Sequence, residues 1–198
     1  MAANEDLELK AQLNLIETMM AEGRRSTESW GWTFLLWGVA YYVATAWATL
    51  GHSNWAWPVT MIAASVLTGV LGVRVSRGHP ETTLGRAIGA VWTAMGVALF
   101  AVLVALGVSG HYDIHAYTAI IGAMLGAANG ASSLILKWKM QSACALIWLG
   151  SGIAGSFGSD TQASIAFLAA VFFCQIVFGI YAMSRDARRR RQYGAVHA

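Results

Sequence analysis

A stretch of 21 residues without a charged side chain, 116–136, constrains the fold of this chain more than any other feature. At about 1.5 Å per residue, a helix of that length reaches about 30 Å, the thickness of a bilayer core. Gly122, Gly126 and Gly130 recur at every fourth position and so share one helix face. Small residues let helices approach closely in lipid, and Asn129 beside them can hydrogen-bond across such a contact. The stretch therefore predicts a membrane-spanning helix that packs on a neighbour through this glycine face.

Five more apolar runs make the chain a polytopic membrane protein. Hydrophobic residues make up 57% of the sequence and charged residues 12%, whereas soluble domains have about 25% charged residues. The runs are continuous and do not alternate in polarity, which argues against a transmembrane β-barrel. We expect an all-α bundle over residues 29–184, with six helices arranged as three antiparallel hairpins because their connections are short. The predicted spans are about 30–50, 57–75, 88–108, 116–136, 140–157 and 164–183.

The basic residues predict the orientation of these spans. Six spans place all 13 lysines and arginines on one side, while the opposite loops contain Asp113 and Asp160 and no basic residue. The positive-inside rule then puts both termini in the cytoplasm. Five spans would move the C-terminal arginines outside, so the charges also support the short, Gly- and Ser-rich run 140–157. We expect an integral membrane protein of the bacterial inner (cytoplasmic) membrane.

The last segment, 185–198, is expected to be a basic cytoplasmic tail. Its arginines can bind anionic lipid headgroups, at about 1 kcal/mol per residue near the surface, or can serve only as a topology anchor. Nothing resembling a folded nucleic-acid module accompanies them, so we do not expect nucleic acid as a partner. The arginines in question are Arg185, Arg188, Arg189, Arg190 and Arg191.

The first segment, 1–28, is predicted to be a cytoplasmic amphipathic helix and linker. Leu9, Leu13, Ile16 and Met20 follow one another at helical spacing and so form an apolar stripe on one face. Such a helix can lie on the membrane, pair with a copy of itself or dock a partner. Membrane-surface helices are usually rich in Lys and Arg, whereas the charges here are mostly acidic. The pattern therefore favours docking of a cytoplasmic protein.

Histidines gather in the loops of the predicted outer side. His111, Asp113 and His115 lie within five residues, and His52 ends the first span on the same side. If their segment is helical, His111 and His115 share a face, and imidazole with carboxylate suits zinc or a similar divalent metal. The alternative interpretation is that they are ordinary polar residues of a membrane interface.

The predicted spans contain few side chains that could carry out a reaction or bind a charged ligand. No ionisable side chain lies deep in any of them, which argues against proton relays and ion-coupled transporters. The two cysteines, Cys144 and Cys174, fit small packing residues, and no cofactor is expected. The polar groups within the spans can hydrogen-bond between helices or form a polar ligand site between the fourth and sixth spans. These groups are Asn129, Ser132, Ser133, Ser151 and Gln175.

These observations favour a non-enzymatic accessory or interaction protein that assembles through glycine-faced helices, as a homo-oligomer or with the cytoplasmic partner. A channel or carrier for a small neutral or lipid-like solute is the alternative, with Asn129 and the Gly-rich run 140–157 lining the path. A membrane enzyme that uses the outer histidines and a metal is the second alternative. The sequence shows no nucleophile–base set and no phosphate-binding loop.

Overall fold

The computed structural model describes residues 2–53, 55–76, 82–110 and 113–196, and these residues form helices and no strand. The helix α7, a π-helical segment η1 and the helix α8 follow one another without a break and form one rod. The bounds are α1 Ala2–Ser29, α2 Gly31–Gly51, α3 Ala56–Ser76, α4 Thr83–Val108, α5 Ile114–Leu136, α6 Lys139–Phe157, α7 Asp160–Val171, η1 Phe172–Val177 and α8 Phe178–Val196.

Five of these helices are long and apolar enough to cross a membrane: α2, α3, α4, α5 and the α7–η1–α8 rod. The prediction of an all-helical chain is confirmed for the described residues, and five helices have the length and composition that a membrane span requires. The helix α6, which corresponds to the predicted span 140–157, is not among the five. It has 19 residues and lies antiparallel along α5.

Side-chain caps fix the starts of α5 and α7. The Asp113 carboxylate caps α5 by accepting from the His115 backbone N–H, and Ser159 with Gln162 forms a capping box at the start of α7. Between α5 and α6 the chain reverses within two residues, Lys137 and Trp138. Lys137 there adopts a left-handed conformation with φ of 47°. These turns place distant parts of the chain at the same end of the bundle.

The bundle has two chemically different ends. At the end we call basic, Arg24 of α1 contacts Leu136 of α5, and Glu28 meets Arg185 of α8. At the other end, which we call acidic, His115 contacts Asp160. Between the ends, aromatic rings pack the centre, with Tyr41 and Trp148 both against Phe167.

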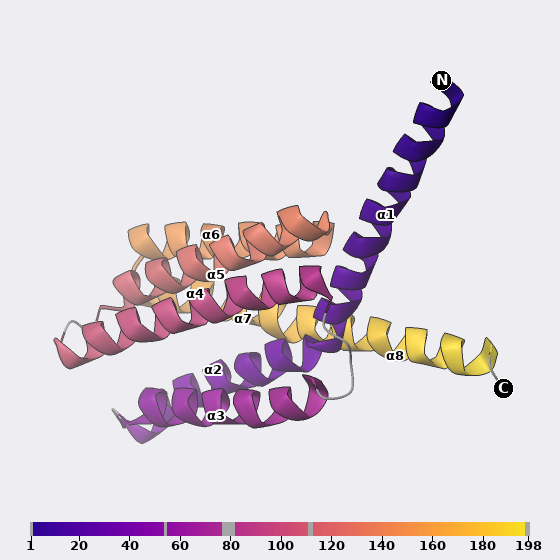
Figure 1. Ribbon diagram of the computed structural model, residues 1–198. Coiled ribbons are helices and arrows are strands. Elements are labelled where there is room, and N and C mark those ends of the chain that lie inside the picture. Colours follow the sequence, from indigo (N-terminus) through magenta and orange to yellow (C-terminus); the bar gives the residue numbers. More distant parts are fainter. Residues whose placement is uncertain (1, 54, 77–81, 111–112, 197–198) are drawn as a thin grey trace.

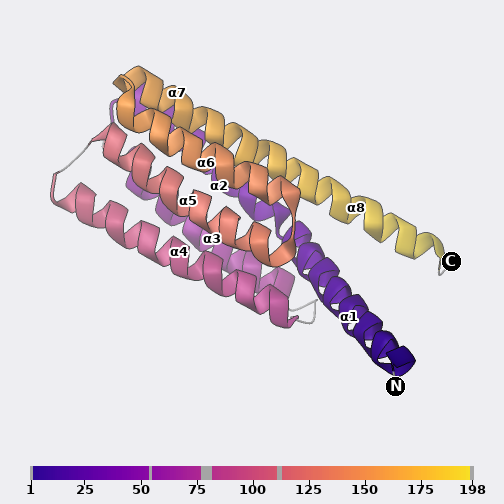
Figure 2. The same ribbon diagram turned by 90° about the horizontal axis from the view of Figure 1, so that it is seen from above.

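Two elements extend past the basic end. The helix α1 leans away from the bundle axis and carries the N-terminus outward, while α8 continues roughly along the bundle (Figures 1 and 2). Within the basic segment 185–198, the helix α8 continues through Val196. Arginine is a good helix former, and the Arg190 Nε donates to Asp186 Oδ2 at 2.8 Å, one turn away.

Candidate functional sites

The glycine face of α5 lies against α6. A Cβ added to Gly122 would be 2.7 Å from both the Gly152 Cα and the Trp148 carbonyl oxygen, so these two backbones touch. A Cβ on Gly126 would be 2.7 Å from Leu149 Cγ, and one on Gly130 would be 3.8 Å from Ala145 Cβ. The neighbour that this face contacts belongs to the same chain. Because α6 covers this face, the face is not available for packing against a second copy of the chain.

Asn129 hydrogen-bonds within its own helix and not across the contact. Its Nδ2 donates to the Leu125 carbonyl oxygen at 2.8 Å, and its side chain is buried. On another side of α5, Trp92 of α4 donates from its Nε1 to Ser132 Oγ at 3.0 Å. Within the described residues the Asn129 Oδ1 has no hydrogen-bond partner.

Two further buried amides lie in the bundle. Both amide atoms of Gln141 on α6 and the Oε1 of Gln175 in η1 lack hydrogen-bond partners among the described residues. Gln141 was missed by the sequence analysis because it lies in the first turn of a short helix next to the basic connection. Unpaired buried amides cost free energy, so Gln141 and Gln175 are unfavourable for stability as they stand.

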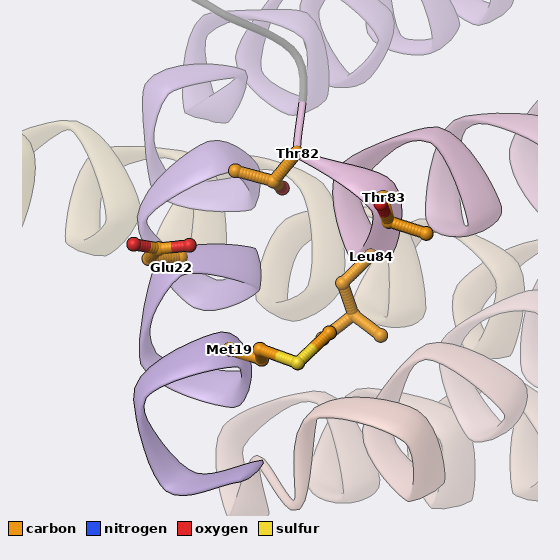
Figure 3. A pocket seen from close by; sticks show the side chains of 5 residues that line it. All are labelled: Met19, Glu22, Thr82, Thr83 and Leu84. Atoms are coloured by element: carbon orange, nitrogen blue, oxygen red, sulfur yellow. The ribbon is translucent and has the colours of Figure 1, made fainter. Parts of the chain in front are cut away.

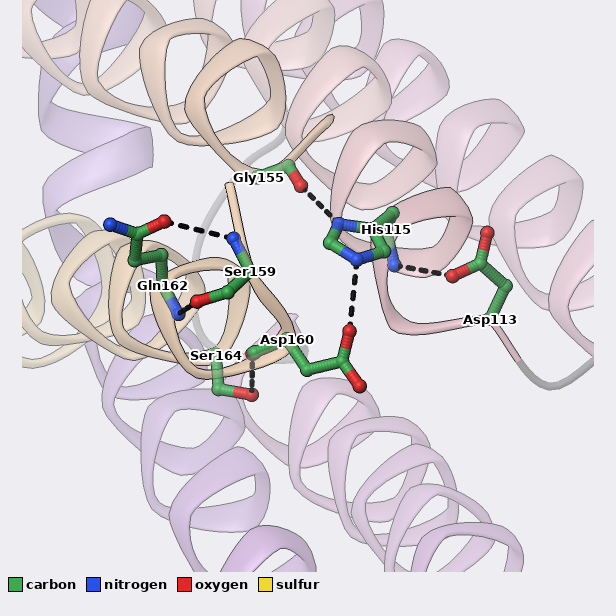
Figure 4. A network of polar contacts seen from close by, with 7 residues as sticks. All are labelled: Asp113, His115, Gly155, Ser159, Asp160, Gln162 and Ser164. Carbon is green, nitrogen blue, oxygen red and sulfur yellow. Dashed lines mark hydrogen bonds and ion pairs between the residues drawn. The ribbon is translucent and has the colours of Figure 1, made fainter. Parts of the chain in front are cut away.

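A polar network at the acidic end joins three helices. The Nδ1 of His115 is 2.6 Å from the Gly155 carbonyl oxygen on α6, and its Nε2 is 3.0 Å from Asp160 Oδ1 on α7 (Figure 4). Both ring nitrogens thus face oxygen acceptors, and only an imidazole with a hydrogen on each nitrogen donates to both. The network holds α5, α6 and α7 together where their connections end.

This arrangement leaves the metal prediction with little support from geometry. A metal needs a free lone pair on an imidazole nitrogen, and both nitrogens of His115 already face acceptors. His52 is exposed at the end of α2, and His111 lies outside the described residues. In the part of the chain that the structure describes, no three His, Cys, Asp or Glu side chains gather as a metal site would require. Elemental analysis of purified protein remains the test of that prediction.

The apolar stripe of α1 is open. Leu9, Leu13 and Ile16 are 56%, 53% and 51% exposed, and Met20, nearest the bundle, is half-buried. Among the described residues, these three side chains therefore lie on a helix face that is about half exposed. A water-exposed row of large apolar residues at helical spacing marks an interaction surface more often than chance placement does.

The other end of α1 is firmly attached to the bundle. A Cβ added to Gly23 would be 2.7 Å from Leu136 Cδ2 and 2.8 Å from Leu84 Cδ2, so the α1 backbone runs directly over these two leucines. The Arg24 Nε donates to the Leu136 carbonyl oxygen at 2.8 Å, which satisfies one of the free carbonyls at the end of α5. Thr27 is buried as well.

A buried carboxylate completes this attachment. Glu28 is 2% exposed and faces two arginines of α8, with Arg185 Nε 3.5 Å from its Oε1 and Arg189 Nη2 3.3 Å from its Oε2. Burial raises the pKa of Glu28, although Arg189 and Arg185 act in the opposite direction. Sequence analysis missed Glu28, whose only signal is an acidic residue directly before a span.

The arginines of the C-terminal segment divide into two groups. Arg185 and Arg189 hold Glu28, and Arg190 pairs with Asp186. Arg188 and Arg191 are exposed on the surface of α8. The binding of lipid headgroups stays a prediction for this segment, with Arg188 and Arg191 as its best-placed residues.

A cavity of about 240 Å³ lies between α1 and the start of α4. Met19 extends across it toward Leu84, while Glu22 and Thr82 flank it (Figure 3). The cavity shows that α1 separates from the bundle at Met19, one turn before Gly23. Residues closer to the N-terminus belong to the free part of the helix.

Comparisons of the chain with protein-family models, with curated proteins and with solved structures find no match.

Proposed function

We propose that this chain is a membrane-embedded interaction protein that presents α1 as a rigid arm to a cytoplasmic protein. The observation that carries the proposal is the contrast within α1. Its last turns are fixed by Gly23, Arg24 and Glu28, while Leu9, Leu13 and Ile16 remain open. An arm with a fixed base lowers the entropy that a docking surface loses on binding.

The proposal is tested by photocrosslinking in living cells. A photoreactive phenylalanine analogue replaces Leu13 on the apolar stripe or, as the matched control, Asn14, which points about 100° further around the helix. A discrete protein adduct is expected from position 13 and not from position 14. Failure of position 13 to give any protein adduct would overturn the proposal.

We further propose that the bundle crosses the membrane six times, with α6 as the sixth span. The support is that the basic side chains of α1 and α8 meet at one end, while Asp113 and Asp160 flank the other. Reporter fusions after Gly51, Gly110 and Gly158 should report the outside, and a fusion after Gly194 the inside. An outside signal at Gly194 would leave only an odd number of spans.

A carrier for a small neutral solute is the second candidate, favoured by the unpaired amides of Asn129, Gln141 and Gln175. A carrier must expose these positions to water at some stage of its cycle. Cysteines placed at Asn129 and Gln141 should then react with a water-soluble maleimide in intact membranes. Complete protection of both positions would remove this candidate.

A further inference from the structure

We propose that Cys144 and Cys174 form a thiol pair that an organic hydroperoxide dissolved in the lipid oxidises to a disulfide. They are the only two cysteines of the chain, and the fold brings them together from α6 and from η1. Both are free thiols in the structure. The inference goes beyond the proposed docking function and does not depend on it, because neither cysteine belongs to α1.

The two cysteines lie directly opposite each other. Cys174 donates from its Sγ to the Cys144 carbonyl oxygen at 3.5 Å, across 30 residues of sequence. The two thiol groups also lie within hydrogen-bonding reach of each other. A disulfide requires Cβ atoms about 3.5–4.5 Å apart and a defined torsion about the new bond. For two thiols already in contact, side-chain rotation is the main movement that bond formation needs.

Aromatic contacts on both sides of the thiol pair fix the register of the two elements. The rings of Trp138 and Phe178 have centroids 5.4 Å apart, and those of Trp148 and Phe167 have centroids 6.2 Å apart. The thiol pair lies between these two contacts along both α6 and the α7–η1–α8 rod. Because the helices are held on either side, they cannot slide past each other, and the thiols stay opposite.

The position of the pair selects the kind of oxidant. Cys144 and Cys174 are 4% and 1% exposed, and buried thiols react poorly with reagents dissolved in water. The neighbouring side chains Phe173 and Val177 of η1 are 52% and 41% exposed on a rod that is long and apolar enough to cross a membrane. In a membrane these two side chains face acyl chains, so the pair is one helix face away from lipid. A π-helical segment such as η1 is rare and is often found at functional sites.

The chemistry balances without leaving a charge in the bundle. One thiol attacks the O–O bond of the hydroperoxide, which gives a sulfenic acid and an alcohol, and the second thiol then displaces water to form the S–S bond. The two sulfur atoms lose two electrons, and these reduce the peroxide. A soft monovalent metal such as Cu⁺ also prefers thiolates, but two thiolates with one Cu⁺ carry a net negative charge, which is costly in an apolar interior. The neutral disulfide avoids that cost.

Oxidation of the full chain in vesicles of saturated phosphatidylcholine tests the inference. Cumene hydroperoxide, which enters lipid, is compared with ferricyanide, which does not. The chain is then unfolded, its remaining thiols are alkylated, and mass spectrometry identifies the peptides. Cumene hydroperoxide should remove both thiols together and give one linked pair of peptides within a single chain, which dithiothreitol separates. The melting temperature should rise by about 5 °C, because the bond restricts the unfolded chain.

Three results would overturn the inference. Two alkylated thiols, or oxidised cysteines without a linked peptide, would show that the pair does not form a disulfide. A covalent dimer would show that the bond joins two chains. Equal oxidation by ferricyanide would show that the oxidant arrives from water.

The matched control keeps two thiols and moves one of them. Cys144→Ser combined with Ser151→Cys places the second thiol two turns further along α6, at another buried position. This variant should give no linked peptide under cumene hydroperoxide. A linked peptide that forms as readily as in the parent would show that the bond does not depend on the contact between Cys144 and Cys174, which would also overturn the inference.

Discussion

The glycine face of α5 and the apolar stripe of α1 are both predicted from residue spacing, but the first is covered in the fold and the second is exposed. Gly122 touches the backbone of α6 at Gly152, and the contact lies inside the bundle. Leu13 on α1 is more than half exposed. Periodicity shows that a helix has a face for packing, but the partner depends on where neighbouring helices lie. The glycine face of α5 is packed against α6, whereas the apolar stripe of α1 stays about half exposed.

The largest effect is expected where the covered face is tightest. Gly122→Leu should destabilise the bundle by about 1–3 kcal/mol or more, because the new side chain meets backbone atoms of Gly152 and Trp148 that cannot rotate away. Gly126→Leu should cost less, because its nearest neighbour is the flexible end of Leu149. Thermal melting in detergent measures both.

The matched control is Gly150→Leu on α6. No atom lies within 4 Å of a Cβ added at Gly150, so this variant should melt like the parent. Equal melting of Gly122→Leu and Gly150→Leu would show that the glycine face does not pack on α6.

An intermediate effect is expected at Glu28, which joins the free arm to the bundle. Because its pKa is raised above 4.5, the folded state holds this proton more tightly than the unfolded state. Its contribution to stability is full below pH 4.5 and declines as the pH rises through the raised pKa. Glu28→Gln should remove that decline, so the difference in melting temperature between parent and variant should change with pH. A difference in melting temperature that stays constant from pH 4 to pH 7 would contradict a raised pKa of Glu28.

The smallest effect on the fold is expected on the open stripe. Leu13→Gln should change the free energy of unfolding of the monomeric bundle by less than about 0.5 kcal/mol, since surface substitutions usually fall in that range. The same variant should weaken association. A large loss of monomer stability would show that the stripe is packed within the chain and would remove the contrast with Gly122.

Sequence reasoning located most helices closely, because apolar runs and turn residues are local signals. The predicted span 116–136 corresponds to Ile114–Leu136, and 30–50 corresponds to Gly31–Gly51. The charges of residues 185–198 predict a basic cytoplasmic tail, and in the structure the helix α8 runs on from the span to Val196. Two of its arginines, Arg185 and Arg189, pair with Glu28.

The candidate sites were harder to predict, because their partners lie far away in the sequence. The oxygen atoms around His115 come from Gly155 and Asp160, which are 40 and 45 residues away. The histidine was noticed for its neighbours His111 and Asp113, and the structure instead pairs its ring with two other helices. Glu28 gave almost no local signal, because its two arginines belong to the far end of the chain.

The sequence by itself determined the membrane class, the helices and the positions of the faces that can pack, since these follow from the hydrophobicity and size of residues at fixed helical spacing. The tertiary structure decided that α6 covers the glycine face, that Glu28 lies between Arg185 and Arg189, and that Leu9, Leu13 and Ile16 remain open. Helices in lipid have little hydrophobic drive to associate, so close backbone contacts and a few polar groups select their neighbours. Those contacts join residues distant in the chain, and no local pattern encodes them.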